Sequence, residues 1–300
     1  MRKPSHTLIA FMVFPIATLA LSGCSKKDSV EKTLPGHWVD LHATKELEFI
    51  KSGPVIASGN SPVSGQWIVD DDGKLIVTFS ALGTTMAEHG QINKGVLEIF
   101  EPDGNMQSYY KIDSMGEIVS EGVESKAVEL SEANTKDIWS TSVYSYAPGG
   151  GGPGGGKEDD HLRVGGYGDE YVALIQFPVD AASDRQPKAV WLQMHTLRDD
   201  GKPAPIVIQP ISSEWNWKRG DRLWWKDLPA ADSSQSLSFQ APEPNSLVRL
   251  DITGLYQAWK NGKANFGLMI RPLRNQNDYT TFYSTRASDA ATRPKLTIIY

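Results

Sequence analysis

Residues 247–300 decide the fold, and their three informative stretches are LVRLDITGLYQAWKNGKANFGLMIRP (247–272), DYTTFYSTRAS (278–288) and RPKLTIIY (293–300). Short runs rich in β-branched or aromatic residues stand at 248–252, 266–270 and 296–300, separated by Gly, Asn, Asp or Pro. This pattern is typical of β-strands.

A short helix is predicted between the first two of these strands. Leu255, Ala258 and Trp259 have helical spacing, and Asn261-Gly262 ends the pattern. We expect Trp259 to pack in a core, because large aromatic side chains are usually buried.

Three further stretches lie upstream, and we take them together with the C-terminal end. They are LRVGGYGDEYVALIQFPV (162–179), KAVWLQMHTL (188–197) and the Trp-rich ISSEWNWKRGDRLWWKDLPA (211–230). With AWKNGKANFGLMIRP, FYSTRAS and RPKLTIIY, they resemble in order the disaggregatase-related DNRLRE domain, also classified as carbohydrate-binding module family 96. The resemblance covers roughly residues 134–300 and implies a jelly-roll-like β-sandwich that binds a polysaccharide. Function must still be argued from a site, because one fold serves many functions.

The N-terminus has the pattern of an export signal. Arg2 and Lys3 precede an apolar run at 8–21, and Leu21-Ser22-Gly23-Cys24 follows. The tetrapeptide resembles a bacterial lipobox, which implies cleavage of a signal peptide (1–23) and lipid modification of Cys24. A transmembrane anchor or an ordinary signal peptide is the alternative, but the run is shorter than the roughly 20 residues that a spanning helix needs.

The predicted lipid anchor has consequences for the rest of the chain. Cys24 is the one cysteine, so no intrachain disulfide can form. Polar residues 24–32 are predicted to be a tether. Ser25, where an aspartate would suggest the inner membrane in enteric bacteria, favours a cell-envelope location at the outer membrane.

Residues 33–113 are predicted to form a small antiparallel β-barrel or meander. Turn signals at Asp70-Asp71-Asp72-Gly73 and Pro102-Asp103-Gly104-Asn105 separate short alternating strands. The pattern weakly resembles small lipocalin-like domains of bacterial lipoproteins. The predicted strands are HWVDL (37–41), ELEFI (46–50), GQWIV (65–69), KLIVTF (74–79), GVLEIF (95–100) and QSYYKI (107–112).

The remaining boundaries follow from composition. Residues 114–132 are polar and are predicted to be an interdomain linker, which makes relative domain motion the default expectation. The second domain is then 133–300, with a first strand near 138–146. Its Gly-rich stretch at 148–156 is interpreted as a loop inside the module.

The net charge and the positions of the histidines argue against two functional classes, nucleic acid binding and catalysis. The net charge of −6 argues against a nucleic acid partner, because no basic stripe is available to neutralise phosphates. The six histidines stand singly, and no nucleophile motif is present. The chain is therefore predicted not to be an enzyme, although a carboxylate pair across a cleft, as in a hydrolase, or a Tyr with Arg, as in a lyase, stays a minor alternative.

Candidate ligand-binding residues are aromatic, since sugar rings stack on aromatic faces while neighbouring charged groups bond their hydroxyls. Trp217, Trp224 and Tyr279 are the aromatic candidates, with Arg222 as a polar partner. Alternation along a strand would leave one Trp of each pair in the core.

Carboxylates beside the Gly-rich loop are a candidate structural calcium site. Asp159 and Asp160, next to Glu158, offer oxygen ligands. A solvated acidic loop is the alternative, because the spacing does not match a calcium-loop motif. No other cofactor is predicted.

The sequence therefore predicts an all-β, two-domain, lipid-anchored envelope protein that binds a polysaccharide without catalysis. A structural or protein-interaction module of an envelope assembly is the alternative. A shallow groove with aromatic and charged side chains would favour a glycan, and a broad apolar patch would favour a protein.

Overall fold

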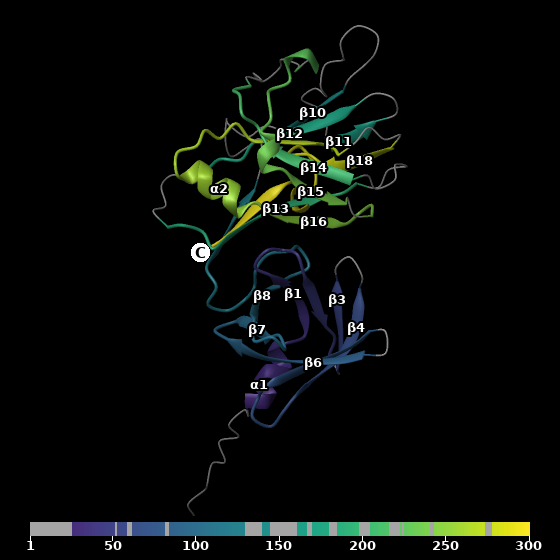
Figure 1. Ribbon diagram of the computed structural model, residues 1–300, viewed down its shortest axis with the longest axis vertical. Helices are drawn as coiled ribbons and strands as arrows, with labels where there is room; N and C mark the ends of the chain where they lie inside the picture. Colours follow the sequence, from purple (N-terminus) through teal and green to yellow (C-terminus); the bar gives the residue numbers. More distant parts are fainter. Residues whose placement is uncertain are drawn as a thin grey trace, which may run out of the picture.

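The computed structural model describes residues 26–51, 53–58, 62–81, 84–129, 140–144, 161–166, 170–179, 185–197, 205–215, 223, 225–240, 243–273 and 278–300. Within these residues the chain is mostly β, which confirms the predicted all-β class. Figure 1 shows two bodies, a barrel nearer the N-terminus and a sandwich that holds the C-terminus.

The first body is a closed barrel in which each of strands β1 to β8 pairs with its chain neighbours and β8 closes back on β1. Inward positions carry the core, including Trp38, Trp67 and Leu97. All six strands predicted here are found, and β3 and β6 are additional. The strands are β1 (Gly36–Asp40), β2 (Glu46–Phe49), β3 (Pro54–Ser58), β4 (Val63–Val69), β5 (Leu75–Ala81), β6 (Thr84–Asn93), β7 (Val96–Phe100) and β8 (Met106–Ile112).

Tight turns close two of the hairpins at the predicted places. Gly73 has φ 81° and donates its N–H to the carbonyl of Asp70 at 3.0 Å. Gly104, with φ 89°, does the same to Glu101 at 2.9 Å. Left-handed φ values of this kind favour glycine. The two turns predicted from the Asp-Gly pairs are therefore confirmed.

Helix α1 (Lys26–Thr33) packs against the end of the barrel at β4, where the sequence suggested only a polar tether. Asp28 in its first turn and Lys32 in its last complement the helix dipole. An eight-residue helix is marginal alone, and here Val30 contacts the barrel core and Lys27 pairs with Asp71 at 3.2 Å.

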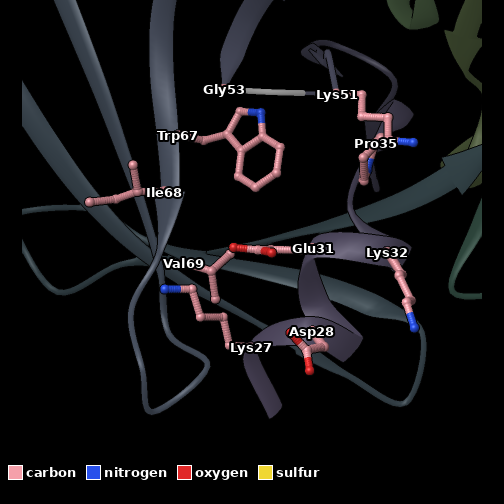
Figure 2. Close-up of a pocket in the computed structure, with 10 residues that line it drawn as sticks. All are labelled: Lys27, Asp28, Glu31, Lys32, Pro35, Lys51, Gly53, Trp67, Ile68 and Val69. Carbon is pink, nitrogen blue, oxygen red and sulfur yellow. The ribbon is translucent and has the colours of Figure 1, made fainter. Parts of the chain in front are cut away.

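A groove of about 890 Å³ lies between α1 and the barrel wall. Figure 2 shows Glu31 and Lys27 of the helix reaching towards Val69, with the Trp67 ring above them. Trp67 is 7% exposed, and its indole N–H donates to the carbonyl of Ile50 at 3.0 Å. The helix thus covers one end of the barrel.

The second body is a sandwich of two sheets around one core, as predicted. In the described residues, one sheet has the order β15-β14-β17-β12-β11-β18, with β10 also pairing with β12, and the other has the order β16-β13-β19-β9. The strands are β9 (Ser125–Glu129), β10 (Ser140–Tyr144), β11 (His161–Gly166), β12 (Tyr171–Ile175), β13 (Ala189–His195), β14 (Pro205–Pro210), β15 (Leu237–Gln240), β16 (Leu247–Asp251), β17 (Leu268–Pro272), β18 (Asp278–Tyr283) and β19 (Lys295–Ile299).

Helix α2 (Thr253–Lys260) crosses between β16 and β17, as the sequence predicts. Asp251 accepts a hydrogen bond from the Thr253 N–H at 2.8 Å, and Asn261 donates to the carbonyl of Gln257 at the other end. Trp259 is 5% exposed and belongs to the sandwich core, in agreement with its expected packing role. Three short 3-10 turns complete the described elements, η1 (Trp225–Asp227), η2 (Ser233–Gln235) and η3 (Ala290–Thr292).

The segment predicted as a linker, 114–132, makes extensive contacts in the structure. Its residues 125–129 form β9, which pairs with β19 of the sandwich. Its first turn lies in the contact between the two bodies, where the Gly116 carbonyl accepts a hydrogen bond from Gln193 at 3.0 Å. Composition alone missed this strand because β9, with the sequence SKAVE, has Val128 as its one large apolar side chain.

Candidate functional site

The outer face of the smaller sandwich sheet is covered by the barrel. Trp191 of β13 is fully buried there, packs edge-to-face on Tyr110 of β8 at 6.4 Å between ring centroids, and donates to the Leu41 carbonyl at 2.8 Å. An apolar cluster from both bodies surrounds it, including Val39, Ile112 and Ile299. This sheet face is therefore not available to a ligand.

Charged side chains are buried in the same contact. Arg249 of β16 pairs with Glu46 of the barrel, and Lys295 of β19 pairs with Glu117. Burial lowers the pKa of Arg249, while the Glu46 carboxylate opposes that shift. The pKa of His195 is also lowered, first by burial and then by the nearby Lys295 charge. We expect such pairs to favour one mutual arrangement of the two bodies, because a shift between the bodies would leave a buried cation without its carboxylate.

One end of the outer face of the larger sheet is apolar and covered. Val172, Leu174 and Met269 alternate with core residues and point outward, where they belong to a second apolar cluster. Trp215 and Trp225 pack on that cluster, and the Trp215 indole donates to the Phe266 carbonyl at 2.6 Å. The described part of the Trp-rich span is irregular with one 3-10 turn, so the strand alternation assumed for its tryptophans does not apply.

The other end of the same face is an open polar groove of about 330 Å³. Val207 forms its floor, paired across the strands with Ser238 on one side and Arg271 on the other. The Arg271 guanidinium contacts the Glu170 carboxylate at 2.8 Å, and 40% of the Arg271 side chain is exposed.

The remaining wall of the groove is polar with one apolar edge. Gln209 donates to the Ser236 hydroxyl at 2.9 Å, and Leu273 is 52% exposed at the rim. Guanidinium, carboxylate, amide and hydroxyl groups thus converge over a small apolar floor. Such a groove can bond the hydroxyls of a sugar ring and contact its C–H face.

Tyr279 is the one predicted ligand-binding residue that lies in the described part of the chain. It is half-buried in β18 opposite Gly165, and the Arg163 guanidinium lies 5.9 Å from its ring centroid. It is on β18, at the far end of the strand order from the polar groove on β14, β15 and β17. The structure therefore does not bring Tyr279 into the groove.

The other predicted site residues lie outside the described residues. These are Trp217, Trp224, Arg222, the calcium candidates Asp159 and Asp160, and the lipidation candidate Cys24. Within the described ranges, no group of three His, Cys, Asp or Glu side chains could hold a metal ion. In the same ranges, no helix is long and apolar enough to cross a membrane.

Residues 158–300 match the model of the family described as carbohydrate-binding module family 96. This match confirms, over these residues, the resemblance that the motifs of the C-terminal part predicted. No curated protein matches the chain.

One solved structure reported as similar is an exo-β-1,3-galactanase from Phanerochaete chrysosporium, crystallised with galactose. The identity is 12% and the TM-score 0.22, with 89% of this chain and 56% of the galactanase chain covered. The chain thus spans just over half the length of that protein. At this TM-score the likeness carries no argument about fold or function.

The polar groove was missed by reasoning from the sequence. Arg271 stands in the quoted run LMIRP, where it is the one charge among apolar residues of a strand. That position was a usable signal, because alternation places it on the face opposite to the core residues Leu268 and Ile270.

Proposed function

We propose that the sandwich binds a polysaccharide in the polar groove without cleaving it, and that the chain is a lipoprotein anchored through Cys24. The family match over residues 158–300 is the observation that carries the first part. The covered face of the smaller sheet supports the choice of the groove, since it leaves the outer face of the larger sheet for a ligand.

Binding without catalysis is the simplest chemistry of this groove. Its charged pair, Arg271 and Glu170, is already engaged in a mutual contact at 2.8 Å, so neither group is poised as a free acid or base. A guanidinium next to a carboxylate provides both donors and acceptors for hydroxyls. This balance suits a neutral glycan, and Arg271 also allows a uronate if the contact with Glu170 opens.

Lipid anchoring through Cys24 is the second part of the proposal. Its support is the sequence pattern that ends at Cys24 and the short distance along the chain to α1, which begins at Lys26. With two or more acyl chains such an anchor would be firm. Only Ser25 separates Cys24 from a helix that packs on the barrel, so the end of the barrel at α1 would lie close to the membrane surface, which we place in the outer membrane.

Arg271→Ala is expected to weaken glycan binding by about tenfold or more, because a hydrogen bond to a charged group contributes about 1.5–3 kcal/mol. The change should alter stability by less than about 1 kcal/mol, since the ion pair it removes is partly exposed. The measurement is affinity electrophoresis or calorimetry of the full mature chain against neutral and uronate polysaccharides at two salt concentrations.

Arg163→Ala is the matched control, because it removes an exposed arginine from the same sheet outside the groove. If Arg163→Ala lost affinity and Arg271→Ala did not, the binding site would be at Tyr279, whose ring Arg163 contacts. If the folded chain binds no polysaccharide of the panel, the result would favour the alternative that the sandwich is a protein-interaction module. Envelope extracts should then be searched for a protein partner.

Metabolic labelling with a radioactive fatty acid tests the anchor. The wild-type chain is expected to carry label and to stay with the membrane fraction, and Cys24→Ala to lose both. Label that persists in Cys24→Ala would contradict the lipobox interpretation.

A further inference from the structure

The barrel has a second recess, at the end away from α1. It has a volume of about 370 Å³ and is formed by residues near the ends of strands β2 to β8. Inward positions along these strands alternate with outward ones, and deeper in the barrel they hold the apolar core. At this mouth several inward positions are charged instead, which packing of the barrel does not require.

One wall of the mouth is apolar. It is made by Val63 of β4, Phe79 of β5 and Met86 of β6, with Ala57 of β3 beside them. Met86 is 50% exposed although it faces the recess. An exposed thioether opposite a phenyl ring provides a flexible surface on which an apolar group can pack.

The facing wall is polar, and most of its groups bond one another. The Lys45 ammonium contacts Glu101 at 3.4 Å and donates to the Gln107 side-chain oxygen at 3.0 Å. The Tyr109 hydroxyl donates to that same oxygen at 2.9 Å, and the Gln107 amide donates to Glu101. The Lys45 ammonium is thus bonded to Glu101 and Gln107 and not to Glu88.

Glu88 also lines the recess, from β6 two residues along the strand from Met86, and it is outside that network. Among the described residues, it makes no hydrogen bond or ion pair. Its pKa is raised, first by burial and then by the Glu101 carboxylate, with Lys45 acting weakly in the opposite direction. Two carboxylates therefore face one ammonium in a partly desolvated mouth, and a bound cation would relieve their repulsion.

We propose that this mouth binds a small organic cation with an apolar body, an aliphatic or aromatic amine, whose ammonium contacts Glu88 and whose apolar part packs on Phe79, Val63 and Met86. The volume is at the lower end of the range for small-molecule sites, about 300–1,000 Å³. The inference is independent of glycan binding, because it concerns the other body of the molecule.

The test is calorimetric titration of the full mature chain with three probes of similar shape, 2-phenylethylamine, 2-phenylethanol and 3-phenylpropionate. We expect the amine to bind at least fivefold more tightly than the alcohol and the carboxylate to bind most weakly. Glu88→Gln should weaken the amine at least tenfold and leave the alcohol unchanged. This variant should fold, since it removes an unpaired carboxylate.

Glu98→Gln is the matched control, because Glu98 lies on β7 of the same barrel, outside the recess, where it accepts a hydrogen bond from Gln91 at 2.8 Å. It should leave amine binding unchanged. The proposal is overturned if the folded chain binds none of the three probes, if the amine has no advantage over the alcohol, or if Glu98→Gln weakens the amine as much as Glu88→Gln does.

Discussion

Trp191→Ala is expected to lower the free energy of unfolding by about 3–5 kcal/mol, the usual cost of truncating a buried Trp to Ala. The Trp191 side chain is fully buried between the smaller sandwich sheet and the barrel. Its loss removes the edge-to-face contact with Tyr110 and leaves the Leu41 carbonyl without its donor. Because the barrel and the sandwich share this contact, the variant should also separate their unfolding transitions.

Thermal and denaturant unfolding of the variant, followed by circular dichroism and calorimetry, give both quantities. Trp191→Phe should cost less, because it keeps a ring next to Tyr110 and loses only the indole N–H and some volume. Ile68→Ala, on the outer wall of the barrel where the side chain is 60% exposed, should stay within about 0.5 kcal/mol. A loss below 1 kcal/mol in Trp191→Ala, with one unchanged transition, would show that this contact does not couple the two bodies.

This contact changes how the sandwich should be studied. A fragment that begins at residue 133 would lack β9 and would expose the face around Trp191, Arg249 and Lys295. In such a fragment the edge of β19 would be unpaired, which invites association with other chains. Glycan binding is therefore best measured on a chain that keeps the barrel and β9.

The strands were predictable where apolar residues alternate with polar ones between clear turn signals. This is true of β5 and β7. Of the four strands from residue 247 onward, β16, β17 and β19 were predicted from short apolar runs, and β18 is additional. β6 was missed because its inward positions include Glu88, Gly90 and a half-exposed Met86, so its alternation carries little apolar contrast. The polar inward positions at the mouth of the barrel thus remove the apolar–polar alternation that predicts a strand.

Elements that depend on tertiary contacts were harder to predict. α1 has one apolar residue that reaches the barrel core, Val30, and its polar composition resembles that of a tether. β9 pairs with β19, a partner that the residues of β9 do not predict. The groove around Arg271 was overlooked for a different reason, because the tryptophans of 211–230 offered a stronger signal for sugar binding than one arginine in a strand.

The tryptophan signal itself is explained by packing where the structure describes it. Trp215 and Trp225 cover Val172, Leu174 and Met269 on the outer face of the larger sheet. Their aromatic area is used to seal the apolar end of that face. The polar groove lies elsewhere on the same face and is lined by none of the residues of 211–230.

Gly165→Ala is expected to destabilise the sandwich by about 3 kcal/mol or more. Gly165 has φ 129°, a value that L side chains rarely adopt, and a Cβ there would lie 2.2 Å from the Asp278 carbonyl oxygen and 2.5 Å from the Tyr279 Cα. Both neighbours are backbone atoms of β18, so relief requires β11 and β18 to separate. Backbone strain of this kind costs about 1–3 kcal/mol alone, and the overlap adds to it.

Gly254→Ala is the matched control, since nothing lies within 4 Å of its added Cβ and its φ is not in the left-handed region. Gly254 is in the first turn of α2, where alanine should raise stability by about 0.4–1 kcal/mol through the unfolded state. Denaturant unfolding gives the free energy of unfolding of both variants. Faster hydrogen exchange of the β11 and β18 amides in Gly165→Ala would show that the loss of stability arises at these strands. Equal stabilities for the two variants would mean that β11 and β18 tolerate separation at Gly165, and the close pairing of Tyr279 with that glycine would then lose its structural importance.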